Sequence, residues 1–125
     1  MLHHLSIAAT DLKRSMIFYD AALTPLGYAR VFTGDESVGY EYIGQGDKLL
    51  LNLESQVSVP GEGFQLAFSA SEPEHVDRFH AAALLHGGCC NGQPGPRPDY
   101  GDNYYAAFAF DPDGYRIEAV VNRAP

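Results

Sequence analysis

The stretch FQLAFSASEPEHVDRFHAAALLHGG, residues 64–88, repeats a stretch that the chain already contains near its N-terminus. Placing Gln65 on His4, an offset of 65 − 4 = 61, aligns residues 4–28 with residues 65–89 without a gap. Seven of the 25 aligned positions are identical. The 125-residue chain therefore contains one structural unit twice, with a histidine in the first copy where the second copy has a glutamine.

Each copy predicts a strand, a helix and three further strands. In copy one, a strand at residues 2–8 precedes Thr10 and Asp11, which offer an N-cap, and Gly27 ends the helix. In copy two, a strand at residues 64–69 precedes a capping box at residues 71–74, and Gly87 ends the helix. The remaining strands are expected at residues 29–32, 38–43 and 48–53, and at 88–91, 104–110 and 115–121.

This order of elements predicts an α+β fold of two tandem βαβββ modules in a single domain, residues 1–125. Module one spans about residues 1–58 and module two about 63–125. Because one module is too small to bury its sheet alone, the two should pack about a pseudo-two-fold axis, with the helices outside and curved half-sheets around a cavity. Strand alternation places His4, Gln65 and Glu118 opposite the helices, so all three are expected to point into this cavity.

Composition and charge exclude several classes of function. A net charge of −8 argues against a nucleic-acid partner or an anionic membrane surface. No run of 18 apolar residues predicts a membrane span, and the N-terminus lacks the features of a secretory signal. The adjacent Cys89 and Cys90 have no CxxC spacing and are expected to be reduced thiols, which favours a cytoplasmic protein.

The stretch PGPRPDYGDNYY, residues 94–105, predicts a stiffened loop beside the cavity, because it contains three prolines and two glycines. Arg97 is expected to contact the substrate, since its planar fork suits a carboxylate, a phosphate or an enolate oxygen. Tyr100 and Tyr105 are the predicted substrate-binding tyrosines. Tyr104 and Tyr105 are neighbours, so only one of them should face the cavity, and the other would pack where the next strand starts.

The motifs of the two copies resemble the vicinal oxygen chelate superfamily. These motifs are H-x-S-I-x-x-x-D-L-x-x-S-x-x-F-Y-D at residues 4–20 and D-P-D-G-x-x-I-E at residues 111–118. That superfamily includes glyoxalase I and the bleomycin- and fosfomycin-resistance proteins. The segments at residues 79–88, 94–100 and 104–108 are similar to a bacterial glyoxalase-like subgroup without a well-defined reaction. The resemblance implies the fold described above and a homodimer.

The resemblance also implies a divalent metal ion held on the first and last strands of the modules. Carried over by position, the ligands are His4, Gln65 and Glu118, although in much of the subgroup the position of Gln65 looks like a histidine. Overlaying the two hairpin turns places Leu50 at the fourth position, and a two-residue register change would place Asn52 there instead. A mixed nitrogen and oxygen site of this kind suits Zn²⁺, Mn²⁺, Fe²⁺ or Ni²⁺.

Each ligand-type residue also has a structural interpretation. His4 can be a hydrogen-bonded strand histidine, and Gln65 a polar residue that lines a cavity. Glu118 lies between Ile117 and Ala119 on a core strand, where an isolated carboxylate would be costly. Glu118 is therefore the residue that most strongly indicates a function.

Two functions remain open. The first is a metal-dependent, glyoxalase-like lyase or isomerase that acts on a small substrate with vicinal oxygens, with Glu118 moving a proton. The second is a metal-free protein of the bleomycin-resistance type that sequesters a small molecule in the same cavity. The enzyme is favoured because three ligand-type residues at related positions exceed what sequestration requires. Neither the substrate nor a dependence on glutathione follows from the sequence.

Overall fold

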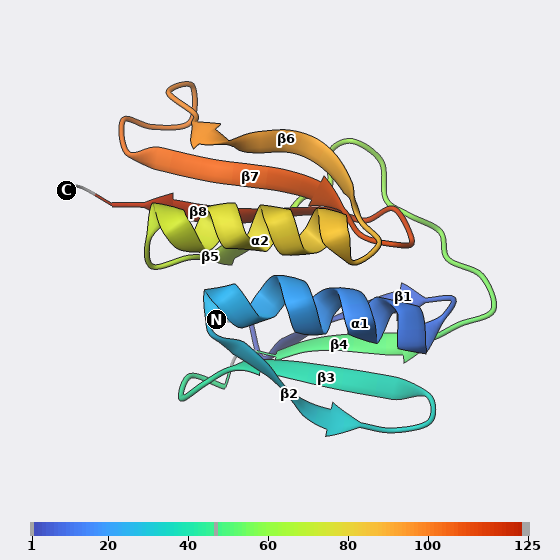
Figure 1. The fold of residues 1–125 in the computed structure, drawn as a ribbon. Helices are drawn as coiled ribbons and strands as arrows, with labels where there is room; N and C mark the ends of the chain where they lie inside the picture. Colours follow the sequence, from blue (N-terminus) through green and yellow to red (C-terminus); the bar gives the residue numbers. More distant parts are fainter. Residues whose placement is uncertain (1, 47, 124–125) are drawn as a thin grey trace.

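The computed structural model describes residues 2–46 and 48–123 and contains the expected duplication (Figure 1). Module one consists of β1 (His4–Ala9), α1 (Leu12–Leu23), a 3₁₀ turn η1 (Thr24–Leu26), β2 (Tyr28–Thr33), β3 (Ser37–Tyr42) and β4 (Lys48–Leu53). Module two consists of β5 (Leu66–Ser69), α2 (Pro73–Leu85), β6 (Cys89–Pro96), β7 (Tyr104–Phe110) and β8 (Arg116–Asn122). The predicted α+β fold of two βαβββ modules is confirmed.

Each module forms its own four-stranded sheet with the same topology. The strand orders are β1-β4-β3-β2 and β5-β8-β7-β6. The parallel pairs are β1 with β4 and β5 with β8, and the other neighbouring strands pair antiparallel. The two helices run side by side, each against one face of the sheet of its module (Figure 1). The opposite face of each sheet, called here its open face, faces away from the helices.

One hydrophobic core joins the helix-covered sides of the two modules. Phe18 of α1 and Phe79 of α2, identical residues at equivalent positions of the repeat, are both 0% exposed. Ile117 of β8 packs in the same core, as alternation along its strand predicts. Because the modules share this core, neither has to bury its sheet alone.

The strand registers settle which residue of module one corresponds to Glu118. Glu118 lies opposite Ala67 of β5, and Leu50 lies opposite Ser6 of β1. Ser6 and Ala67 are equivalent in the repeat, since 67 − 6 = 61. Leu50 is therefore the counterpart of Glu118, and Asn52 is displaced from that position by two residues.

The two helices begin in different ways. Asp11 caps α1 as predicted, and its carboxylate accepts a hydrogen bond from the backbone N–H of Arg14 at 3.0 Å. Pro73 takes the first helical position of α2. The predicted capping box is wrong, because the N-cap is Glu72 and makes no side-chain cap. The carboxylate of Glu72 instead forms an ion pair with Arg123 at 2.6 Å.

Strand β6 is longer than predicted and includes residues that were expected to form a loop. It continues to Pro96, whereas the sequence predicted a strand that ends at residue 91. Prolines are tolerated here because β6 is the edge strand of its sheet, and its register shifts twice against β7. The expected loop is consequently shorter, and Arg97 directly follows the strand.

Two further expectations concern thiols and membranes. Cys89 and Cys90 form no disulfide, as the sequence predicted, and both are exposed. Within the described ranges, no helix is long and apolar enough to cross a membrane.

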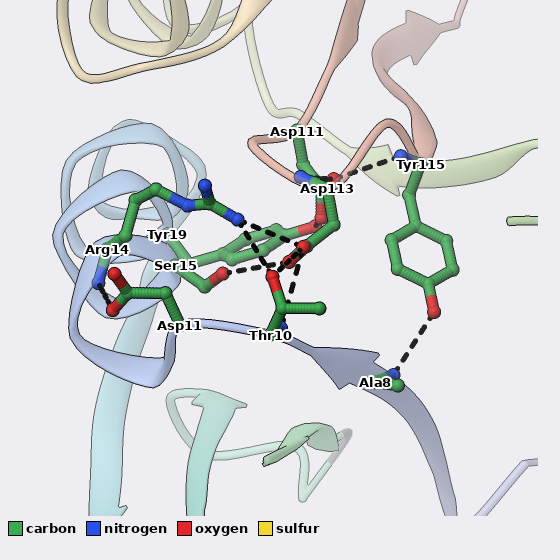
Figure 2. A network of polar contacts seen from close by, with 9 residues as sticks. All are labelled: Ala8, Thr10, Asp11, Arg14, Ser15, Tyr19, Asp111, Asp113 and Tyr115. Carbon is green, nitrogen blue, oxygen red and sulfur yellow. Dashed lines mark hydrogen bonds and ion pairs between the residues drawn. The ribbon is translucent and has the colours of Figure 1, made fainter. Parts of the chain in front are cut away.

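The turn between β7 and β8 is fixed by the buried carboxylate of Asp111 (Figure 2). Its Oδ1 accepts the backbone N–H groups of Asp113 and Tyr115, each at 2.9 Å, and its Oδ2 accepts the hydroxyl of Tyr19 at 2.7 Å. Burial raises the pKa of Asp111, and these three donors oppose that rise. Since Tyr19 lies on α1, the contact links the two modules.

Asp113 makes the second link between the modules (Figure 2). Its Oδ1 accepts the Thr10 hydroxyl at 2.7 Å and an Arg14 N–H at 3.0 Å, and its Oδ2 accepts the Ser15 hydroxyl at 3.3 Å. Its side chain is only 5% exposed, so water does not replace these donors readily. The motif D-P-D-G therefore holds the start of α1 against the last hairpin of module two.

Replacing Asp113 with alanine should lower the free energy of unfolding by about 2–3 kcal/mol, because it leaves several donors at the junction without their acceptor. Urea unfolding measures the change, with Asp35→Ala as the control at an exposed aspartate. Equal losses in the two variants would show that the junction does not depend on this carboxylate.

Candidate functional site

Two adjoining hollows occupy the open face of the second sheet, and both are lined by Gln65, Tyr100 and Phe108. The first, of about 550 Å³, is called here the acid hollow and is completed by Asp99, Tyr104 and Glu118. The second, of about 460 Å³, is called the arginine hollow and is completed by Glu62, Asn91, Gly92, Arg97 and Arg116. Of the predicted site residues, Gln65, Arg97, Tyr100 and Glu118 are thus brought together.

Glu118 is the buried acid of the acid hollow. Glu118 is only 4% exposed, and its Oε2 accepts a hydrogen bond from the Tyr104 hydroxyl. Burial raises the pKa of Glu118, and the hydrogen bond from Tyr104 and the charge of Arg97 partly oppose this rise. Burial and the same hydrogen bond raise the pKa of Tyr104 to about 12, so the phenol remains the donor at neutral pH.

The prediction that Tyr105 lines the cavity has to be corrected, because Tyr104 takes that place. The Tyr105 hydroxyl donates to Asp77 of α2 at 2.6 Å, and its ring packs against the core. The sequence contained a usable signal, since Tyr105 shares its strand face with Ala107 and Ala109, two small residues that fit under a helix. Sequence reasoning therefore missed Tyr104 as a residue of the site.

Arg97 and Tyr100 frame the boundary between the two hollows. The guanidinium of Arg97 lies over the ring of Phe108, 5.3 Å from its centroid. It donates hydrogen bonds to the carbonyl oxygens of Gln93 at 2.5 Å and Pro96 at 3.2 Å. Tyr100 is 64% exposed and packs edge-to-face against Tyr104. Both predicted residues thus lie where a ligand on this face would contact them.

His4 does not line either of these hollows. It is exposed on the first sheet, where its Nδ1 lies 2.9 Å from Nδ1 of His3. It lines a third hollow, of about 260 Å³, together with residues of β5 such as Ala67 and Ser69. The predicted ligands therefore line different hollows, since His4 lines this one and Gln65 and Glu118 line the acid hollow.

The fit of a metal ion to one copy of the chain is incomplete. Gln65 and Glu118 offer an amide oxygen and a carboxylate in the acid hollow, but catalytic metal sites commonly use three protein ligands. In residues 2–46 and 48–123, no three His, Cys, Asp or Glu side chains gather in a way that could hold a metal ion. His4 does not line the hollow that contains Gln65 and Glu118, so the three predicted ligands are not gathered around one hollow.

The fold agrees with a comparison of the chain with known families. Residues 1–119 match the profile of the Glyoxalase/Bleomycin resistance protein/Dioxygenase superfamily. The chain belongs to this superfamily. Membership accounts for the duplicated βαβββ unit and for the open faces on which the predicted site residues lie.

Solved structures of the superfamily are similar over almost the full chain. A glyoxalase/bleomycin resistance protein from Albidiferax ferrireducens is 32% identical, with a TM-score of 0.83, over 96% of this chain and 97% of that one. A glyoxalase-type protein from Bacillus halodurans is 26% identical, with a TM-score of 0.74, over 96% and 94%. The fosfomycin resistance protein FosX from Mesorhizobium loti, at 14% identity and a TM-score of 0.73 over 98% and 92%, shares the fold. None of the curated proteins compared with the chain matched it.

Glu118→Gln should stabilise the protein at neutral pH by about 1 kcal/mol, because the amide avoids the burial of a charge. The raised pKa of Glu118 gives stability below its unfolded-state pKa, and this stability is lost as the pH rises through the folded-state pKa. The advantage of the variant should therefore grow with pH across that window. Urea unfolding from pH 4 to 8 measures it, and a difference that stays constant with pH would contradict the buried-carboxylate argument.

Proposed function

We propose that the chain is a glyoxalase-like enzyme, a lyase or isomerase that moves a proton on a small substrate with vicinal oxygens, and that Glu118 is its acid–base residue. The proposal rests chiefly on the burial of the Glu118 carboxylate beside Gln65 in the acid hollow. A buried acid in a site costs stability, and a functional requirement explains why it is kept. Superfamily membership supports a small-molecule substrate.

The surroundings of Glu118 suit a proton carrier. Burial raises its pKa, which brings the carboxyl closer to the balance between acid and base that proton transfer needs near neutral pH. Tyr104 holds Oε2, while within the described residues Oε1 accepts no hydrogen bond. Oε1 is therefore the atom that takes a proton from the substrate and returns it. The Tyr104 phenol, whose pKa is about 12, fixes the orientation of the carboxyl without losing its own proton.

The metal-dependent form of this proposal uses His4, Gln65 and Glu118 with Zn²⁺, Mn²⁺, Fe²⁺ or Ni²⁺. Because His4 lines a different hollow from Gln65 and Glu118 within one copy, the proposal takes its imidazole from a second copy of the chain, so a homodimer is part of the proposal. Phe32, which is 53% exposed beside Gly39 and Leu50, supplies apolar surface for such a contact. When bound, the ion would polarise two adjacent substrate oxygens.

A metal-free binding protein is the second candidate. It is favoured by the aromatic side chains on the open face of the second sheet. Tyr100 is mostly exposed, and Phe108 lines both hollows, so their rings can cover a flat ligand without any reaction. In that case Glu118 would serve only to recognise the ligand.

Proton transfer can be tested before the natural substrate is known. In D₂O, we expect the wild-type protein to exchange the C–H next to the carbonyl of at least one compound in a panel of vicinal dicarbonyl and α-hydroxycarbonyl compounds. Proton NMR follows the loss of the signal. Glu118→Gln should slow the exchange by about 10²-fold or more, the usual contribution of general acid–base catalysis. Binding without exchange, equal in both proteins, would favour the sequestering protein.

The metal site is tested by elemental analysis of the purified protein. We expect near-stoichiometric transition metal, lost in Glu118→Ala and reduced in His4→Ala, but kept in His75→Ala, a histidine change on α2. Gln65→His should tighten Zn²⁺ and Ni²⁺ in a titration, because imidazole nitrogen is the stronger neutral ligand for these ions. The mass of the particle in solution reports the dimer. No gain of affinity in a folded Gln65→His variant would remove Gln65 from the metal site.

A further inference from the structure

We propose that the arginine hollow binds an anionic group of the substrate, a carboxylate or a phosphate, between Arg97 and Arg116. The proposal extends the proposed function, because it takes the adjoining acid hollow as the reacting end. It assigns a substrate class to this hollow. It also adds Arg116, which the sequence did not indicate as a site residue.

Both guanidiniums are placed by aromatic rings of the same strand. Arg97 lies over Phe108, and Arg116 lies over Phe110, 5.5 Å from its centroid. Phe108 and Phe110 are two residues apart on β7, so both project from the open face. Stacking on a ring restricts a guanidinium and leaves its edge for hydrogen bonds. The two arginines therefore form a pair of positioned donors in one hollow.

Within the part of the chain that the structure describes, Arg97 and Arg116 form no ion pair with an acidic side chain. The ion pairs within residues 2–46 and 48–123 use Arg14, Arg30, Arg78 and Arg123. Glu62 also lines the arginine hollow, but it forms no ion pair with Arg97 or Arg116 within those ranges. In a chain with a net charge of −8, carboxylates are abundant, so two arginines without one on a single face indicate a site kept for an external anion.

The first module provides an internal comparison. There, Lys48 is the counterpart of Arg116, since both lie two residues before the equivalent pair Leu50 and Glu118. Lys48 lies opposite the acidic Glu41 across the strands, whereas Arg116 lies opposite Phe110. The duplicated position thus has an acid across from the base in one module and an aromatic platform in the other. This difference leaves the charge of Arg116 available to a ligand.

The C-terminal part of β6, just before Arg97, is shaped to hold the guanidinium of Arg97. A Cβ on Gly92 would lie 2.9 Å from the Phe108 ring and 3.3 Å from the guanidinium, and a Cβ on Gly95 would lie 3.2 Å from it. Only glycine leaves this space without a shift of the stack. The carbonyl oxygens of Gln93 and Pro96 accept one N–H each, which leaves the other N–H groups of the fork for an anion.

The position of the two hollows defines the substrate further. Gln65, Tyr100 and Phe108 line both, so a small molecule that spans them places its anionic group at the arginines and its reacting carbon near Glu118. The substrate class is therefore a small acid, a carboxylate or phosphate compound, whose vicinal oxygens lie next to the charged group.

Binding of three probes tests the subsite. Phenyl phosphate and benzoate have the same ring as benzyl alcohol but differ from it in charge, and NMR titration measures each affinity. We expect the better anion to bind about tenfold or more tightly than the alcohol, and to lose about tenfold or more in Arg97→Gln and in Arg116→Gln. The tighter of the two anions identifies phosphate or carboxylate as the natural group. Arg78→Gln, which changes an exposed arginine on α2, is the matched control and should have no effect.

Two results would overturn the subsite: benzyl alcohol that binds as well as both anions, or anion affinity that is retained in either arginine variant. Melting temperatures confirm that the variants are folded. Glu118→Gln separates this proposal from the proposed function, because it should stop proton exchange and still bind the anion. Failure of the exchange experiment would therefore leave the anion result interpretable, and the reverse also holds.

Discussion

The buried carboxylates of Asp111 and Asp113 are the constraint on which the rest of the structure depends. Asp111 closes the turn from β7 to β8 through two backbone N–H groups, and its bond from Tyr19 anchors that turn to α1. Asp113 holds the start of α1 to the same turn. The closed turn sets the register of β7 and β8, which places Phe108 opposite Glu118. Phe108 lines both hollows, and Glu118 lines the acid hollow.

Electrostatics then couples the two hollows. Burial raises the pKa of Glu118, while the charge of Arg97 lowers it. An anion held by Arg97 would cancel part of that positive charge and add a negative one nearby, so the pKa of Glu118 would rise when the proposed substrate binds. A carboxyl that gains proton affinity on binding is better prepared to accept a proton from the substrate. In this way, the anionic group would contribute to reactivity as well as to affinity.

Much of the fold could be predicted because duplication and alternation are local signals. The repeat gave both helices, and period-two alternation placed Glu118 on the open face. The site was harder to predict, because it depends on how whole modules pack. Alternation placed His4 and Gln65 on equivalent faces, but only the packing of the modules decides that the two residues line different hollows. Tyr105 was placed in the site because the two adjacent tyrosines look alike in the sequence. Ala107 and Ala109, which share the strand face of Tyr105, are the signal that this face packs under a helix.

The difference between His4 and Gln65 belongs to a wider divergence between the modules. At several positions in the shared core the copies agree, as Phe18 and Phe79 or Ala22 and Ala83 do, because close packing restricts the volume at both positions. On the open faces this constraint is absent, and leucine at position 50 corresponds to Glu118. Module one therefore keeps the scaffold and presents an exposed histidine, while module two has gathered a buried acid and stacked arginines. Because core packing does not fix the residues at these surface positions, the second copy could take up the side chains of a site there.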